Sequence, residues 1–310
     1  MLNESMKTIL DLKVGAPKTV KNLTLFPLSG NPAASLEYMM IDLALDTSQA
    51  VVEEVSEGGS VPELRLVNKS EKVLLVPDGT ELVGAKQNRI VNATLLIPPK
   101  STTKIPVSCV EQGRWGYRTR GFRSSPHHAA HRLRKEMLVH QKMSLKEKRG
   151  YESDQGKIWS GVNNISNEVG FHSPTSALHD VYEGKKGDIE DYLAKFKAQS
   201  KQTGAVFFLG NRFEGMELFD KPSTFSKLFK KILSGVALDA LTSQSGQEKV
   251  DVDGLRSEVT KLFGEIDQAF FEKFKAPVGI GEDWRYEGQA SIGKVLYYEG
   301  ELIHLSAFRR

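Results

Sequence analysis

The 310-residue chain is 39% hydrophobic and 26% charged, with a formal net charge of +3, which is typical of a globular protein and excludes an intrinsically disordered one. The single cysteine, Cys109, excludes an internal disulfide and a multi-cysteine metal site. No window approaches the roughly 18 apolar residues of a membrane-spanning helix. The first residues also lack the apolar run of a secretory signal peptide. We therefore expect a cytoplasmic protein with no membrane partner.

Positive charge is concentrated in one segment, residues 112–150, which holds eleven Lys or Arg side chains against two Glu. It also holds four of the seven histidines: His127, His128, His131 and His140. A local positive field favours an anionic partner, such as a phosphate or a nucleic acid. The histidine spacing could also place two metal ligands on one helix face, but the neighbouring arginines disfavour a cation. We expect no metal site.

The first half of the chain is typical of short strands joined by turns. Leu36–Leu45 fits either a strand or a short helix, because its length and periodicity do not separate the two. The other strands are expected over Leu23–Leu28, Val51–Val55, Glu63–Asn68, Val73–Val76, Glu81–Val83, Arg89–Ile97 and Ile105–Val110. Such a series favours an antiparallel β-sandwich or a barrel-like sheet.

Helices are concentrated in the second half. An exposed loop at 116–125 is expected to precede a helix from about Pro126 to Lys148, and later helices are expected over Asp188–Gln199, from near Ser223, and over Gly254–Phe274 with Asp253 as cap. Strands are expected over Ala205–Leu209, Met216–Phe219 and a closing hairpin, Ala290–Tyr298 with Leu302–Phe308. The fold class is therefore α+β. We expect a β-rich region over 1–203, with a basic insertion at 114–150, and an α+β region over 204–310, unless both form one domain.

Residues 78–115 hold the densest set of chemically capable side chains next to strands. Gln87, Asn88 and Arg89 directly precede a strand, and buried amides need several hydrogen-bond partners. Gly84 permits close approach of the backbone, and Glu81 lies across the turn. These residues form either a structural network or a ligand cradle.

A second set of candidates follows the last strand of this region. If Ile105–Glu111 is extended, Cys109 and Glu111 share one face, and Glu111 lies where the core meets an opening. Arg114 could bind a phosphate and Trp115 could stack on a base. The alternative is a structural Glu111–Arg114 ion pair beside a core tryptophan. Cys109 is interpreted as a small buried hydrophobe, since no neighbouring base is evident.

The same residues carry a family resemblance. Glu81-Leu-Val-Gly-Ala-Lys-Gln-Asn-Arg89 and Pro106-Val-Ser-Cys-Val-Glu-Gln-Gly-Arg-Trp115 resemble the ARG and rhodanese-phosphatase-superfamily-associated protein domain, and the similarity extends to Gly204-Ala-Val-Phe-Phe-Leu and to the closing Glu301-Leu-Ile-His-Leu-Ser-Ala-Phe-Arg. This prokaryotic domain is named for gene neighbours that include ADP-ribosylglycohydrolases. The resemblance implies metabolism or signalling with ADP-ribose or related nucleotides, and it assigns no catalytic residues.

Three functions are consistent with these observations. The first is binding or processing of an ADP-ribose-like or other phosphorylated nucleoside. In it Arg89 and Arg114 hold phosphate, Gln87 and Asn88 orient ribose or base, and Trp115 stacks. Any chemistry would be a hydrolysis, with Glu81 and Glu111 as the acid/base pair; no cofactor is identified. The second is a non-enzymatic module that binds an acidic partner or forms a homo-oligomer. The third is nucleic-acid binding through residues 114–149.

Overall fold

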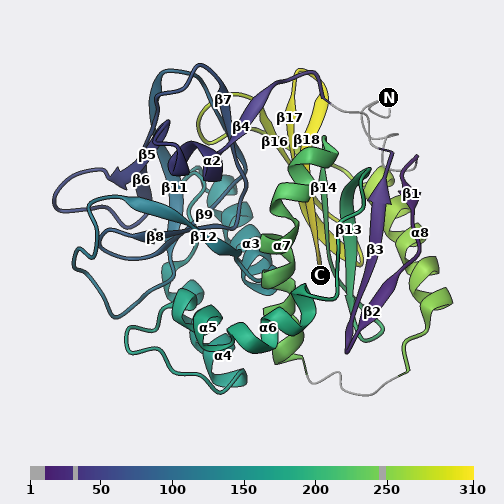
Figure 1. Ribbon diagram of the computed structural model, residues 1–310. Coiled ribbons are helices and arrows are strands. Elements are labelled where there is room, and N and C mark those ends of the chain that lie inside the picture. Colours follow the sequence, from purple (N-terminus) through teal and green to yellow (C-terminus); the bar gives the residue numbers. More distant parts are fainter. Residues whose placement is uncertain (1–10, 31–33, 244–248) are drawn as a thin grey trace. The chain divides into compact units, whose positions relative to one another are not determined.

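The computed structural model describes residues 11–30, 34–243 and 249–310 (Figure 1). The chain divides into two compact units. Unit 1 comprises residues 1–35, 190–275 and 281–310, and unit 2 comprises residues 36–189 and 276–280. The first unit thus contains the N-terminal strands together with the C-terminal third of the chain. The predicted boundary between 203 and 204 stays a prediction.

Unit 1 is built on one nine-stranded, antiparallel sheet. Along the sheet the strands follow the order β1 (Lys13–Val14), β3 (Leu23–Ser29), β13 (Gln202–Leu209), β14 (Arg212–Phe219), β18 (Glu301–Arg309), β17 (Ser291–Tyr298), β16 (Glu282–Glu287) and β15 (Glu272–Lys275), and β2 (Lys18–Val20) also pairs with β3. The predicted hairpin at Glu299 and Gly300 is confirmed as β17 and β18. Both turn residues adopt the positive φ that a tight hairpin turn requires.

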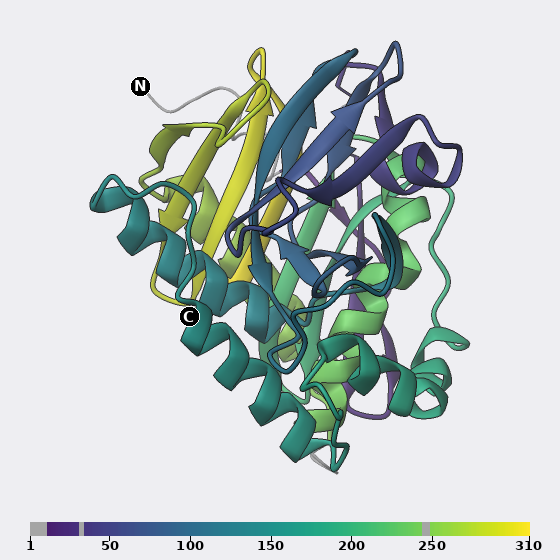
Figure 2. The ribbon, with the colours of Figure 1, turned by 90° about the vertical axis from the view of Figure 1, so that its left-hand side faces the viewer.

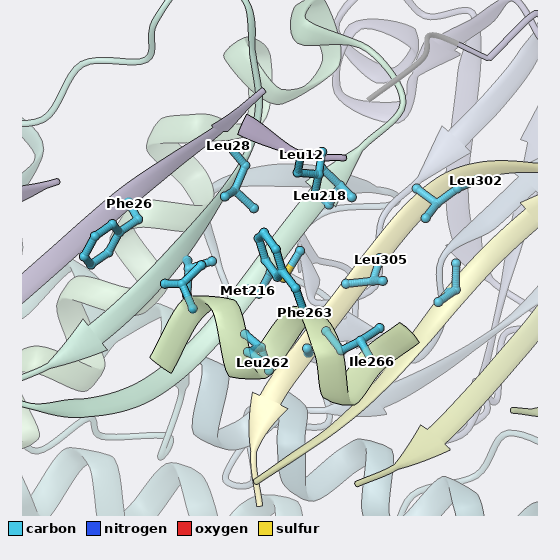
Figure 3. Close-up of a cluster of buried hydrophobic side chains, with 14 of the residues drawn as sticks. Leu12, Phe26, Leu28, Met216, Leu218, Leu262, Phe263, Ile266, Leu302 and Leu305 are labelled. Atoms are coloured by element: carbon cyan, nitrogen blue, oxygen red, sulfur yellow. The ribbon is translucent and has the colours of Figure 1, made fainter. Parts of the chain in front are cut away.

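Two helices, α7 (Pro222–Thr242) and α8 (Val252–Gln268), pack on this sheet. Leu262, Phe263 and Ile266 of α8 lie against Met216 and Leu218 of β14 in the main core of this unit (Figure 3). The next residue of β14, Phe219, contacts Phe225 of α7. Because strand side chains alternate, the two helices cover opposite faces of the sheet.

The boundaries predicted for α8 were partly wrong. Its cap is Asp251, whose carboxylate accepts a hydrogen bond from the N–H of Gly254 at 3.0 Å, and not Asp253. The helix ends at Gln268, and Glu272–Lys275 form β15 instead. The reason is long-range pairing with β16, which outweighs the helical pattern of the local sequence.

Unit 2 contains a six-stranded sheet that curls into a barrel-like form. The order is β12 (Phe122–His128), β8 (Thr80–Gly84), β9 (Arg89–Val91), β11 (Ser101–Cys109), β6 (Glu63–Asn68) and β5 (Ala50–Glu54). Its two edges meet where Glu53 of β5 pairs with Gly121, the residue directly before β12. We call this sheet the barrel. It confirms the predicted antiparallel, barrel-like sheet in the first half of the chain.

A second, three-stranded sheet lies in the same unit, with the order β10 (Leu95–Ile97), β7 (Val73–Val76) and β4 (Tyr38–Met40). The single strand predicted over Arg89–Ile97 was wrong, because β9 and β10 belong to different sheets. Asn92 lies between the two strands, and its side chain donates to the backbone oxygen of Tyr151 and accepts from the Ser108 hydroxyl. Leu36–Leu45 contains both predicted possibilities, since β4 leads directly into helix α2 (Ile41–Asp46).

The helices of unit 2 include α3 (His131–Lys146), α4 (Gln155–Glu168) and α5 (Leu178–Gly184); α6 (Lys186–Leu193) crosses the boundary between the units. Helices α3 and α4 pack side by side (Figure 2). The helix predicted from Pro126 begins five residues later, because Phe122–His128 extend the barrel as β12, and a register shift accommodates Pro126. The helix predicted over Asp188–Gln199 is shorter, and Asp188 lies in its first turn.

Most of the candidate residues lie at one end of the barrel. Strands β5, β8 and β11 end there, and β6, β9 and β12 begin there. We call this end the mouth; the loops 55–62, 85–88 and 110–121 surround it. The predicted α+β class is confirmed. At the mouth, the sheet of the barrel places a polar cluster where the apolar core reaches the surface.

Candidate functional site

Four polar side chains occupy the inner face of the barrel at its mouth: Glu54, Gln87, Arg89 and Cys109. Arg89 and Cys109 are paired across β9 and β11, two positions from Val91 and Val107 of the apolar core. Glu54 follows Ala50 and Val52 on the core face of β5. Gln87 accepts from the Arg89 guanidinium at 3.2 Å and from the Cys109 thiol at 3.0 Å. The apolar interior thus ends in a charged, hydrogen-bonding layer.

Arg89 is fully buried, yet two of its three guanidinium nitrogens have no hydrogen-bond partner in the described part of the chain. Its Nη1 donates to Gln87, whereas Nε and Nη2 are buried and unpaired within residues 11–30, 34–243 and 249–310. Burial lowers the pKa of Arg89, and the nearby Cys109 and Glu54 partly oppose this effect. The guanidinium still stays protonated near neutral pH. A buried charge with an unpaired donor edge is costly and calls for a functional explanation.

Cys109 behaves as the sequence predicted. It is a free cysteine with no exposed surface. Burial raises the pKa of its thiol to about 11, although the Arg89 charge acts in the opposite direction. The protonated thiol therefore serves as a packed, weakly polar group and not as a nucleophile.

Trp115 covers Arg89 and is itself half-exposed, at 48%. The Arg89 guanidinium lies 5.7 Å from the centre of the Trp115 ring, and the Lys86 ammonium lies 5.3 Å from it. Lys86 also lies 5.2 Å from the centre of the Tyr117 ring. Tyr117 is 52% exposed. The predicted alternative of a core tryptophan is therefore wrong, and two half-exposed aromatic side chains lie at the mouth.

Glu111 and Arg114 form a buried, bidentate ion pair. Arg114 donates from Nε to Oε1 at 2.8 Å and from Nη2 to Oε2 at 2.6 Å. The carboxylate also accepts from the backbone N–H of Asn88 at 3.1 Å and from the Thr175 hydroxyl at 2.9 Å. Each carboxylate oxygen thus accepts two hydrogen bonds, so the carboxylate is saturated. Burial opposes ionisation of Glu111, but these hydrogen bonds, led by that from Arg114, outweigh it and lower its pKa.

The remaining donors of Arg114 hold two loops together. They bond to the backbone oxygens of Ala85, Gly116 and Gly84 and to the side chain of Asn88. Its side chain is only 10% exposed. The Glu111–Arg114 pair therefore fixes residues 84–88 against residues 111–116, which matches the structural alternative weighed from the sequence. It leaves Arg114 few donors for a ligand.

Glu81 lies on the outer face of the barrel. Its neighbour Leu82 is in the apolar core, so the alternation of β8 directs Glu81 away from it. There Glu81 Oε2 lies 3.2 Å from Nδ1 of His179, and Oε1 is buried without a hydrogen-bond partner in the described chain. Burial would lower the pKa of His179, but the hydrogen bond and charge of Glu81 raise it overall. The outer face thus holds a separate acid–histidine pair.

An open groove of about 790 Å³ runs beside the mouth. Two segments form it, 53–57 with Arg65 on one side and 117–120 on the other: Glu53, Glu54, Val55, Ser56, Glu57, Arg65, Tyr117, Arg118, Thr119 and Arg120. Arg118 also lies 3.7 Å from the Glu111 carboxylate. The groove combines an aromatic ring, guanidinium groups and carboxylates, and its size suits a small ligand.

The structure brings together Gln87, Asn88, Arg89, Glu111, Arg114 and Trp115, as the sequence analysis predicted, and places Glu81 on the opposite face of the sheet from Arg89. Their roles in binding or catalysis stay predictions. Sequence reasoning missed Glu54, Lys86, Tyr117 and His179. Only Glu54 had a usable signal, because the alternation of Val51–Val55 places it on the same face as Val52.

The basic segment is more structured than its charge pattern indicated. Helix α3 buries His131 and Arg134, and Arg134 binds Asp78 through Nε and Nη2. The described residues contain no group of three or more His, Cys, Asp or Glu placed to bind a metal ion. None of the described helices is long and apolar enough to cross a membrane. Nucleic-acid binding and homo-oligomerisation through 114–149 stay predictions.

Comparison with curated proteins finds no match, and comparison with solved structures finds none either. A family model matches residues 11–308, nearly the whole chain. The match includes both units and the complete mouth of the barrel. The chain belongs to the ARG and rhodanese-phosphatase-superfamily-associated protein domain family.

Proposed function

We propose that this protein binds a phosphorylated nucleoside of the ADP-ribose kind at the mouth of the barrel. The observation that carries the proposal is the buried Nε–Nη2 edge of Arg89, which has no hydrogen-bond partner among the residues that the structure describes. This edge presents two parallel donors, the geometry that suits two oxygens of a phosphate. In Arg114 and Arg134 the same edge binds a carboxylate of the protein. In Arg89 this buried edge has no partner among the described residues, and we assign it to the phosphate of a ligand.

The surroundings of Arg89 supply the other parts of a nucleotide site. Trp115 and Tyr117 offer half-exposed rings on which a base can stack. Arg118 and Arg120 line the adjoining groove and add positive charge for a second phosphate. The groove volume of about 790 Å³ lies within the usual range for small-molecule sites. The family description includes ARG, which we read as the ADP-ribosylglycohydrolases for which the domain is named, and this association favours ADP-ribose among such ligands.

The contacts of Arg114 and Glu111 change which residue is assigned to each role in this proposal. Phosphate binding is assigned to Arg89, because Arg114 already donates its hydrogen bonds to Glu111 and to backbone oxygens. For the same reason the saturated Glu111 is poorly suited to transfer a proton. A hydrolytic activity on a nucleotide or ADP-ribose derivative bound at the mouth would therefore depend on Glu54, whose Oε2 has no hydrogen-bond partner in the described residues, because Glu81 lies on the outer face of the barrel.

A thermal-shift panel with ADP-ribose, NAD, ADP and AMP tests the proposal. A ligand at about 100 times its dissociation constant adds roughly 2.7 kcal/mol to the free energy of unfolding. Arg89→Lys keeps the charge but removes the two-donor edge, so we expect it to lose most of the shift. Arg149→Ala is the matched control, since Arg149 is an exposed arginine paired with Glu147. The proposal fails if no phosphorylated nucleoside stabilises the wild-type protein.

A further inference from the structure

Glu54 is a buried carboxylate that the sequence analysis did not select. It ends β5 on the core face, is 6% exposed and lines the groove. Its Oε1 accepts one long hydrogen bond, from the backbone N–H of Lys86 at 3.3 Å, and Oε2 has no hydrogen-bond partner in the described residues. Its neighbour Glu53 faces the other way and binds Arg65 at 2.7 Å. The two adjacent carboxylates therefore differ in burial and in pairing: among the described residues, Glu53 is paired with a cation and Glu54 is not.

A glycine turn covers the free oxygen of Glu54. A Cβ atom added to Gly59 would lie 3.3 Å from Glu54 Oε2 and 3.1 Å from Cζ2 of Trp115. Gly59 also has a φ of +78°, which disfavours other residues on conformational grounds. The turn is held to Lys86, whose ammonium donates to the backbone oxygen of Gly58 at 3.0 Å. This bond is exposed, so the turn over Glu54 is fastened by a contact that water can replace.

We propose that Glu54 is the residue that recognises the ribose of the ligand, by accepting hydrogen bonds from its two neighbouring hydroxyl groups once the turn over it has lifted. An ionised carboxylate is an acceptor only, so its complement must carry donors. A vicinal diol offers two adjacent O–H donors to the two oxygens. Phosphate would be repelled by Glu54 and attracted by the nearby Arg89, so the two residues recognise opposite parts of one ribose phosphate.

This inference rests on the proposed function, and a pair of ligands separates the two. ADP and 2′,3′-dideoxy-ADP differ only in the diol, and isothermal titration calorimetry gives the dissociation constant of each. We expect the wild-type protein to bind ADP roughly 10- to 100-fold more tightly, the usual worth of hydrogen bonds to a charged group. In Glu54→Gln the ratio should fall towards one, whereas the matched control Glu53→Gln should keep the wild-type ratio.

The outcomes are distinct. Equal affinity of the wild-type protein for ADP and its dideoxy analogue overturns the inference and leaves the proposed function standing. An unchanged ratio in Glu54→Gln overturns it too. The absence of binding by both ADP and ADP-ribose removes the proposed function and the inference together. The wild-type comparison needs no variant, so a folding defect in Glu54→Gln does not obscure the answer.

Lys86→Met provides a second readout, because it removes the bond to Gly58 and keeps most of the side chain. If the turn must lift before the ribose enters, this variant should bind ADP with a several-fold higher association rate constant in stopped-flow tryptophan fluorescence. An unchanged association rate would show that the turn does not control entry, and the role of the turn in the proposal would be wrong.

Discussion

Arg114 binds both carboxylate oxygens of Glu111, at 2.8 and 2.6 Å, through the same edge of the guanidinium that in Arg89 has no partner among the described residues. The two arginines lie in one polar cluster at the mouth of the barrel, where Arg89 acts to lower the pKa of Cys109 and Arg114 acts to lower the pKa of Glu111. One arginine is thus part of the scaffold, and the other is the candidate for ligand binding. This division leads to separate predictions for stability and for binding.

Replacing Glu111 should reduce stability. Glu111→Ala leaves the Arg114 guanidinium buried without its counter-charge, and breaking such a pair typically costs about 3–5 kcal/mol. Urea denaturation followed by circular dichroism measures the loss. Glu53→Ala is the control, because Glu53 forms a partly exposed pair with Arg65 and should cost about 1 kcal/mol or less. Similar losses in both variants would contradict the structural role of Glu111.

The contribution of Glu111 should depend on pH. Its pKa in the folded protein is lowered, so its stabilising effect is complete above the unfolded value of about 4.3 and is lost as the pH falls through the folded value. The difference in unfolding free energy between the wild type and Glu111→Gln should be constant above about pH 5 and shrink below it. A difference that persists unchanged at the lowest accessible pH would be inconsistent with a lowered pKa.

His179 should titrate above an ordinary histidine. Burial lowers its pKa, but Glu81 raises it more, with help from Glu183 and against the charge of Arg123. A raised folded pKa gives stability that is complete below the unfolded value of about 6.5 and is lost as the pH rises through the folded value. NMR titration of the ring should show this elevation, and Glu81→Gln should remove it. His127, whose pKa burial lowers, should titrate below the ordinary value in the same spectra.

Cys109 should be unreactive in the folded protein. With a pKa of about 11 and no exposed surface, it forms almost no thiolate near neutral pH. Alkylation by iodoacetamide at pH 8 should be roughly two orders of magnitude slower than in urea-denatured protein, where the thiol has an ordinary pKa. Comparable rates in both states would show that the barrel interior is open at this position.

The strands of the barrel could be predicted because their side chains alternate. Glu63–Asn68, an alternating strand of the barrel, was predicted with the boundaries that the structure shows, and so was Val73–Val76, a continuous apolar run that lies in the three-stranded sheet. The failures occurred where a distant partner decides the local structure. Arg89–Ile97 divides because its two ends pair with different strands, and the predicted helix lost Glu272–Lys275 to pairing with β16. Neither partner is visible from a local window of sequence.

The residues that lie together at the candidate site could be predicted from the sequence. Which of them are structural and which could bind a ligand could not. The proximity of Gln87, Asn88 and Arg89 to Glu111 follows from neighbouring strand ends, which the pattern of turns indicated. Which of Arg89 and Arg114 would be paired depends on side-chain geometry that the sequence does not carry. Glu54 was missed because it lies more than thirty residues away along the chain and joins the site only when the barrel closes.

NMR of the arginine Nε–H groups tests the central claim most directly. The Arg89 resonance is assigned by its absence in Arg89→Lys, and ADP-ribose is then added to the wild-type protein. We predict a large downfield shift of the Arg89 signal, from a new hydrogen bond to phosphate, and little change in the Arg114 signal. Binding of ADP-ribose with the Arg89 signal unmoved, or no binding at all, would contradict the assignment of the unpaired Arg89 edge as the phosphate site.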